Sequence, residues 1–248
     1  MARAAPLSIR FIRLIRLLAH LLRGLLIVTL RFPFADAKQQ AAHVRSWSQQ
    51  LLRILAIDVE LRGALVGERA LVVANHVSWL DIFVLDSVRA LRFVSKSEVA
   101  RWPLIGRLAT AAGTLYIKRQ SRHAVRGIIE SAARALRDGN SVGIFPEGTT
   151  GDGDDVGQFH ASLFAAALES GATIQPAAIA YLDENGVRAP HAVYSGDTTL
   201  LESMLRIIAA RRTTAVLSFA APIAPDAHTR RELATLSRAA VRDALMRV

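Results

Sequence analysis

The residues of this chain that are best placed to do chemistry are His76 and Asp81, which lie five positions apart in the stretch 71–85. A neutral imidazole titrates near neutral pH and can accept the proton of a hydroxyl group. A carboxylate on its other ring nitrogen fixes the tautomer and stabilises the imidazolium that forms. The pair therefore predicts a general base that turns an alcohol into a nucleophile.

The elements around this pair decide whether its two side chains can meet. Residues 71–74 are apolar and rich in β-branched side chains, which predicts a strand buried on both faces. Ser78 and Asp81 fit a capping box, so a helix is expected to follow with Ser78 as its N-cap. On one continuous helix His76 and Asp81 would point roughly 140° apart, whereas a strand-to-helix turn lets them face each other. The alternative is that Asp81 only caps the helix and His76 is a satisfied turn residue.

A second motif, SVGIFPEGTT at 141–150, repeats this layout of a short apolar strand followed by a polar turn. Glu147 would stand at the carboxyl end of a parallel strand, where open α/β sheets bind their ligands. By itself, the sequence Pro-Glu-Gly-Thr is also typical of an ordinary turn. The motif gains weight only in combination with His76 and Asp81.

Four blocks of the sequence, taken in order, resemble those of the glycerolipid acyltransferases of the 1-acylglycerol-3-phosphate acyltransferase type. The NHxxxxD block lies at 75–81 and the FPEGT block at 145–149. Two weaker blocks are GTLYIKR at 113–119 and IQP at 174–176. The resemblance spans roughly residues 57–220, and the ordered set is far more specific than any one block.

This resemblance implies transfer of a fatty acyl group from acyl-CoA or acyl carrier protein to the hydroxyl of a lysophospholipid. The first acceptor to consider is 1-acyl-sn-glycerol-3-phosphate, which would give phosphatidic acid. His76 would be the base and Asp81 its orienting partner, with no metal and no cofactor beyond the acyl donor. The residues expected to bind the acceptor head group or shape its pocket are Lys118, Arg119, Glu147, Gly148 and Thr149.

The chain departs from the family at Thr150, because the third block usually continues with arginine after the threonine. A guanidinium that could bind a phosphate through two parallel hydrogen bonds is therefore missing. Some members of the wider family acylate lyso-ornithine lipids, whose head group is an amino acid. That acceptor is the alternative.

The first 35 residues contain six arginines and no acid, which predicts a helix at a membrane surface. Its apolar side chains would lie among acyl chains and its arginines at lipid phosphates. The longest uncharged stretch, 24–30, has seven residues, whereas a spanning helix needs ~20, so we expect monotopic or peripheral association. At 100° per residue, an arc of roughly 140° holds the side chains of Arg10, Arg13, Arg16, His20, Arg23 and Arg31.

Two alternatives compete for this segment, a signal peptide and a helix that packs on a partner protein. Arginines every few residues argue against the signal peptide. A second helical pattern over 35–57 completes a hairpin, so we divide the chain into a membrane-association segment, 1–57, and an acyltransferase domain, 58–248. The cytoplasmic face of the inner membrane is the expected location.

Composition excludes several other functions. The chain has no cysteine, which excludes a thiolate nucleophile and a disulfide framework. A net charge of +10 favours an anionic partner and leaves a basic nucleic-acid-binding module as an alternative from a different class. Against it, aromatic residues are only 6% of the chain and leave little for stacking on nucleic-acid bases. A lipid esterase that uses the His–Asp pair on water stays possible, although no Gly-x-Ser-x-Gly elbow occurs. We find no metal-ligand spacing among the histidines.

From residue 58 onward, short apolar runs alternate with amphipathic helical patterns. Strands are expected near 58–62, 70–74, 92–95, 115–118, 142–145, 173–181 and 215–219. This rhythm predicts a three-layer α/β domain with a mixed or largely parallel sheet flanked by helices.

Overall fold

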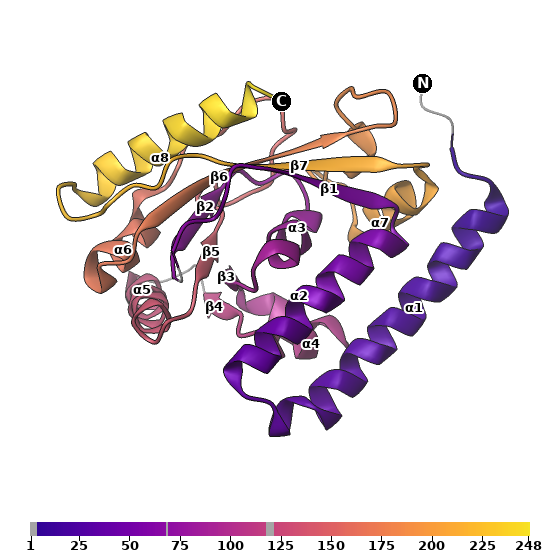
Figure 1. The fold of residues 1–248 in the computed structure, drawn as a ribbon, viewed down its shortest axis with the longest axis horizontal. Helices are drawn as coiled ribbons and strands as arrows, with labels where there is room; N and C mark the ends of the chain where they lie inside the picture. Colours follow the sequence, from indigo (N-terminus) through magenta and orange to yellow (C-terminus); the bar gives the residue numbers. More distant parts are fainter. Residues whose placement is uncertain (1–3, 68, 118–121) are drawn as a thin grey trace.

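The computed structural model describes residues 4–67, 69–117 and 122–248, and within them seven strands form one sheet (Figure 1). The strands are β1 (Ile57–Arg62), β2 (Leu71–Ala74), β3 (Arg92–Lys96), β4 (Leu115–Ile117), β5 (Val142–Ile144), β6 (Ile174–Leu182) and β7 (Thr213–Phe219). The helices are α1 (Leu7–Leu30), α2 (Ala37–Ile54), α3 (Leu80–Val88), α4 (Ile105–Ala111), α5 (Arg122–Arg137), α6 (Ala165–Ser170), α7 (Leu200–Ala209) and α8 (Arg230–Leu245).

The strand order β1-β7-β6-β2-β5-β3-β4 makes the sheet mixed but largely parallel, as the sequence predicts. Only β6 and β7 pair antiparallel among the described strands. The carboxyl ends of β2, β3, β4, β5 and β6 therefore meet at one edge. Because β2 pairs directly with β5, Val73 lies beside Ile144, and the turns that carry the two main motifs leave the sheet as neighbours.

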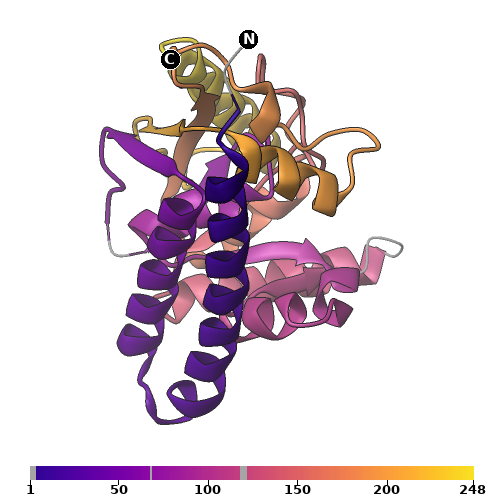
Figure 2. The same ribbon diagram turned by 90° about the vertical axis from the view of Figure 1, so that its right-hand side faces the viewer.

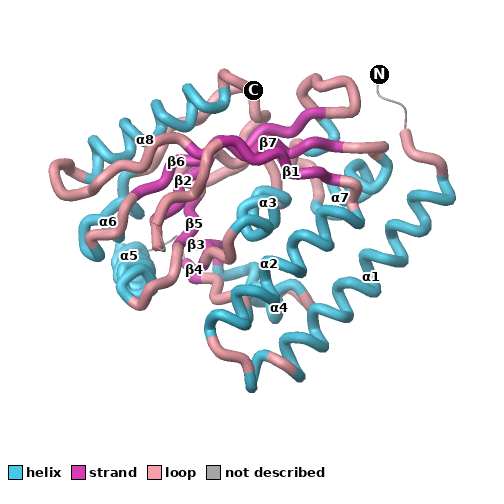
Figure 3. Tube along the Cα trace, viewed as in Figure 1, coloured by secondary structure: helices cyan, strands magenta, loops and turns pink. Residues whose placement is uncertain are grey.

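Helices cover both faces of this sheet, which confirms the three-layer prediction (Figure 3). On one face, α2, α3 and α7 pack with the side chains of alternate strand residues such as Val72, Ile179 and Leu217. On the other face, α5, α6 and α8 cover the opposite set, which includes Val73 and Ile144. β2 is buried along its whole length, as its uniform apolarity requires.

The predicted hairpin is formed by α1 and α2, joined by a short 3₁₀ turn (Figure 2). A capping box of Asp36 and Gln39 begins α2. His20 on α1 stacks on Trp47 of α2 with ring centroids 4.5 Å apart, and Leu17 and Leu52 belong to the same buried cluster as the sheet. The hairpin thus shares its core with the catalytic body, and the division at residue 57 stays a prediction.

The basic stripe of α1 does not all face outward, which corrects for Arg13 the expectation that the arginines of this helix lie at lipid phosphates. His20 is buried against α2. Arg13 donates to the carbonyl oxygens of Ile208 and Arg211, both at 2.9 Å. The last carbonyls of a helix have no partner within it, so Arg13 satisfies those at the end of α7. The exposed surface of α1 is mainly apolar, and Arg16 and Arg23 are exposed beside it.

Stability is expected to fall as pH rises, because α3 carries a buried carboxyl group at Asp86. Burial raises the pKa of Asp86 from 3.8 to about 8, and a hydrogen bond from the Leu91 N–H opposes the shift. The unfolded chain loses this proton near pH 4 while the folded chain keeps it, so unfolding is favoured progressively between pH 4 and 8. Each pH unit contributes up to about 1.4 kcal/mol.

Asp86→Asn cannot ionise yet keeps an oxygen for the Leu91 N–H. We expect its free energy of unfolding, measured with urea, to exceed that of the native chain by an amount that grows from pH 5 to pH 8. A difference that stays constant over this range would show that Asp86 does not titrate as described.

Candidate active site

His76 and Asp81 meet at the carboxyl end of β2, where the chain turns into α3. His76 Nδ1 lies 2.8 Å from Asp81 Oδ2. The His76 side chain keeps 20% of its surface exposed and that of Asp81 none. Among the described residues none forms a hydrogen bond with His76 Nε2. The arrangement holds one imidazole nitrogen on a buried carboxylate and leaves the other free to accept a proton.

Asp81 is held by more than the imidazole. Its Oδ2 also accepts hydrogen bonds from the backbone N–H groups of Val77 at 2.7 Å and Ser78 at 3.0 Å. Its Oδ1 accepts the Tyr181 hydroxyl at 2.7 Å. Burial first, and then the neighbouring Asp81, raise the pKa of Tyr181 well above its usual value, so this hydroxyl acts as a donor. Four donors are a suitable environment for a buried anion.

Sequence reasoning missed Tyr181, which lies on β6, 100 residues from Asp81. The available signal was the only hydroxyl in a mostly apolar buried strand, because a buried tyrosine hydroxyl needs a partner. The partner itself depends on the pairing of β6 with β2.

The predicted capping box forms only in part. With Ser78 as its N-cap, α3 would begin at Trp79, but it begins one residue later, at Leu80. The Ser78 hydroxyl is buried and has no hydrogen-bond partner among the described residues. Asp81 accepts the Ser78 N–H, which is half of a capping box. The carboxylate is shared with the imidazole, so its two proposed roles coexist.

Asn75, the first residue of the NHxxxxD block, fixes the turn to the sheet. Its amide nitrogen donates to the Ile179 carbonyl at 2.9 Å and its oxygen accepts the Ile179 N–H at 2.8 Å. The side chain thus continues the β2–β6 pairing beyond the end of β2. Tyr181, two residues further along β6, is thereby held in reach of Asp81.

Glu147 contacts the backbone of the catalytic turn. Its Oε1 accepts the His76 N–H at 2.8 Å and its Oε2 accepts the Gly157 N–H at 2.9 Å. Burial raises its pKa, and the two N–H groups act against that shift. A Cβ on Gly157 would lie 2.6 Å from Oε2, so only glycine allows this approach. Glu147 therefore positions His76 in addition to lining the predicted pocket.

The predicted pocket is a cavity of about 380 Å³ at the carboxyl ends of β3, β4 and β5. Phe145 lines it and stacks on the His76 ring with centroids 4.1 Å apart, so one aromatic ring separates the cavity from His76, which does not itself line it. Lys118 and Arg119, expected here as head-group ligands, lie outside the described residues, although Ile117 just before them lines the cavity. Its walls include Lys96, Glu147, Gly148, Thr149, His160 and Ser162.

Lys96 is a second residue that sequence reasoning missed. It ends β3, pairs in register with Ile117 and lines the cavity. The signal was its position at the carboxyl end of a predicted strand, the same criterion that singled out Glu147.

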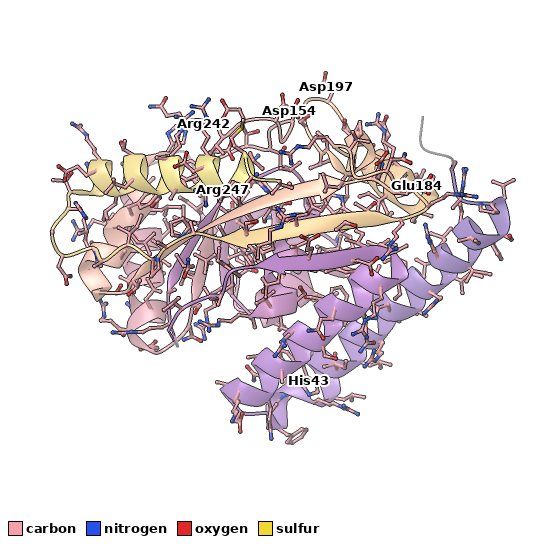
Figure 4. All side chains as sticks on the ribbon, turned by 45° about the horizontal axis from the view of Figure 1, so that its top comes forward. His43, Asp154, Glu184, Asp197, Arg242 and Arg247 are labelled. Atoms are coloured by element: carbon pink, nitrogen blue, oxygen red, sulfur yellow. The ribbon has the colours of Figure 1, made fainter. Side chains whose placement is uncertain are left out.

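A second cavity, of about 330 Å³, lies on the other side of the catalytic turn. Val77 and Tyr181 line it together with Arg188 and Arg206. One of its walls is the acidic loop after Thr150, which Arg242 of α8 fixes through a 2.9 Å ion pair with Asp155. Figure 4 shows Arg242 on α8 near this loop.

Comparison with known proteins agrees with this geometry. The acyltransferase family matches residues 49–180, more than half of the chain. A lyso-ornithine lipid O-acyltransferase of Pseudomonas aeruginosa is 40% identical over 216 residues, which cover 87% of this chain and 83% of that protein. A 1-acyl-sn-glycerol-3-phosphate acyltransferase of Neisseria gonorrhoeae is 37% identical over 149 residues, which cover 60% of this chain and 58% of that protein.

The fold is similar to that of a crystal structure, the 1-acyl-sn-glycerophosphate acyltransferase PlsC from Thermotoga maritima. The TM-score is 0.70 at 20% identity, and the match covers 95% of this chain and 97% of that one. The family match includes both motif-bearing turns, and the long alignment to the Pseudomonas protein extends beyond it. This chain therefore belongs to the acyltransferase family.

Proposed function

We propose that this enzyme transfers a fatty acyl group from acyl-CoA or acyl carrier protein to the hydroxyl of a lysolipid. The observation that carries this proposal is the His76–Asp81 pair, with Nδ1 on a buried carboxylate and Nε2 open. Nε2 accepts the hydroxyl proton as the oxygen attacks the thioester carbonyl. The tetrahedral intermediate then expels the thiolate, which takes the proton from the imidazolium, so no covalent enzyme intermediate forms.

The oxyanion of that intermediate needs hydrogen-bond donors. The N–H groups of Val77 and Ser78 already donate to Asp81, and that of Gly148 donates to the Phe145 carbonyl. No acceptor is described for the N–H groups of Glu147, Thr149 and Thr150 in the turn 145–150, and of these we propose Thr149 and Thr150 as the donors.

We propose a lyso-ornithine lipid as the favoured acceptor. Thr150 stands where a phosphate-binding arginine is usual, and Lys96 is the one permanent cation among the described residues that line the larger cavity. A lysine with nearby hydroxyls suits the single charge of an amino-acid carboxylate better than a phosphate monoester. The second candidate is 1-acyl-sn-glycerol-3-phosphate, favoured by the four sequence blocks and by the Neisseria relative.

An acceptor panel with one acyl donor tests this choice. We expect kcat/KM for lyso-ornithine lipid to exceed that for lysophosphatidate by about tenfold or more, the effect of one charge-assisted hydrogen bond. Thr150→Arg should shift the ratio toward lysophosphatidate, and Thr150→Ser is the matched control. A native enzyme that prefers lysophosphatidate would reverse the assignment, and hydrolysis without any acyl donor would point to the esterase.

We also propose that the enzyme works at a membrane surface, on the cytoplasmic side of the inner membrane, where thioester donors and lipid acceptors meet. No helix among the described residues combines the length and apolarity needed to cross a bilayer. The support is an unbroken stripe of exposed apolar side chains along α1. Its members, called here the α1 stripe, are Leu7, Phe11, Ile15, Leu18, Leu22, Leu26 and Leu30.

A further inference from the structure

Large apolar side chains are also exposed on two elements that flank α1. Trp102, Leu104 and Ile105, here the α4 loop, are 41%, 43% and 37% exposed at the start of α4. Leu201 and Leu205 on α7 are 61% and 50% exposed, and their spacing puts them on one face of that helix. Isolated exposed leucines need no explanation, but groups of them mark interaction sites.

Helix α1 contacts α4 and α7, the two helices on which these exposed groups lie. Its first half is fixed to α7, because Arg13 donates to the Ile208 carbonyl. Its second half packs on α4, where a Cβ on Gly24 would lie 3.2 Å from the Leu108 side chain. Figure 1 shows α7 beside the upper part of α1 and α4 beside its lower part. The α1 stripe, the α4 loop and the α7 pair therefore belong to neighbouring, mutually packed elements.

The backbone of the α4 loop is strained at Leu104, which has a positive φ. Leu104 has φ 63° and ψ −56°, a region that non-glycine residues rarely adopt at a cost of about 1–3 kcal/mol. Gly106, two residues later, is so close to the Ala100 carbonyl oxygen that a Cβ would lie 2.3 Å from it. Strain of this kind, next to three exposed apolar side chains, is typical of a functional segment.

Charge indicates the chemistry of the surface that α1 and the α4 loop contact. The segment 99–129 contains no acidic residue, like the segment 1–35. Arg101 and Arg107 are exposed on either side of the α4 loop. Apolar side chains flanked by arginines, with no nearby acid in the segment, suit the boundary between acyl chains and anionic head groups.

Both flanking groups lie close to the cavities. The 3₁₀ turn Ser97–Arg101 leads from Lys96, in the wall of the larger cavity, directly to Trp102. Arg206, which lines the second cavity, follows Leu205 on α7. We propose that the α1 stripe, the α4 loop and the α7 pair form one surface that docks on an anionic bilayer. This rests on the proposed function, since docking there brings both cavities to the lipid head groups.

Vesicle sedimentation tests the surface without requiring that the acceptor be known. The full chain is mixed with vesicles of phosphatidylethanolamine and phosphatidylglycerol. We expect Trp102→Gln with Ile105→Gln, and separately Leu201→Gln with Leu205→Gln, each to lower the partition coefficient by about tenfold. The matched control, Val187→Gln with Leu236→Gln, changes two exposed apolar residues outside the proposed surface and should bind like the native chain.

Leu104→Gly is the informative single variant, because glycine accepts a positive φ. It removes the apolar side chain while relieving the strain, so weaker vesicle binding with a melting temperature that does not fall below that of the native chain supports the surface. Native-like binding by both double variants and by Leu104→Gly would overturn the proposal and leave membrane contact to α1. The proposed function would fail on a different measurement. It fails if the native chain transfers no acyl group to any acceptor, and this result does not depend on how the chain binds vesicles.

Discussion

His76→Ala is expected to lower acyl transfer by about 10²- to 10⁴-fold, the usual contribution of a positioned general base. Among the described residues none forms a hydrogen bond with Nε2 of this imidazole, and the ring stacks on Phe145, which lines the larger cavity. Without it, the acceptor hydroxyl must attack with its proton in place. The measurement is the initial rate of acyl transfer at saturating donor and acceptor, so that the loss is read in kcat.

The variant must remain folded for this loss to be informative. The backbone of residue 76 keeps its bonds to Glu147 and Gly151 whatever its side chain, so we expect native far-UV circular dichroism and native vesicle binding. His43→Ala is the matched control, because His43 lies on α2 of the hairpin (Figure 4) and lines neither cavity, and it should retain full activity. A His76→Ala enzyme with native kcat would remove the imidazole from the mechanism.

Much of this site could be predicted from the sequence because its main parts are local. The residues of each motif lie within a few positions of a buried strand end, and apolar runs such as 71–74 identify those strands. The carboxyl ends of parallel strands share one edge, so the turns at His76 and Glu147 could be placed together before their contacts were known.

The parts that sequence did not predict depend on contacts between distant segments. Tyr181 reaches Asp81 only through the order of the strands. Helical periodicity predicts lipid contact for the arginines of α1, because it places residues on a face without saying what covers that face. Arg13 instead binds the end of α7, almost 200 residues away. The sequence predicts Glu147 as a pocket residue, and its bond to the His76 N–H follows from β2–β5 pairing.

Asp81→Asn is expected to lower kcat by about 10²-fold, the lower end of the range for general base catalysis. The buried carboxylate stabilises the imidazolium that forms when His76 takes the hydroxyl proton, and asparagine removes that charge. The turn can survive, because the amide oxygen can replace Oδ2 and accept from the Val77 and Ser78 N–H groups and from His76. The amide nitrogen would then donate to the Tyr181 oxygen. The His76 ring thereby keeps its proton on Nδ1 and its acceptor on Nε2, so the decrease in kcat should be smaller than that of His76→Ala.

Tyr181→Phe separates the charge of Asp81 from its hydrogen bonding. This variant removes one donor of four and leaves the carboxylate ionised against His76, Val77 and Ser78. We expect a decrease in kcat of less than about tenfold, since one hydrogen bond to a charged group contributes about 1.5–3 kcal/mol at most and the remaining three donors compensate in part. Neither variant should raise KM for the acyl donor. If Asp81→Asn retained native kcat while Tyr181→Phe lost it, the tyrosine hydroxyl rather than the carboxylate would be the group on which the imidazole depends.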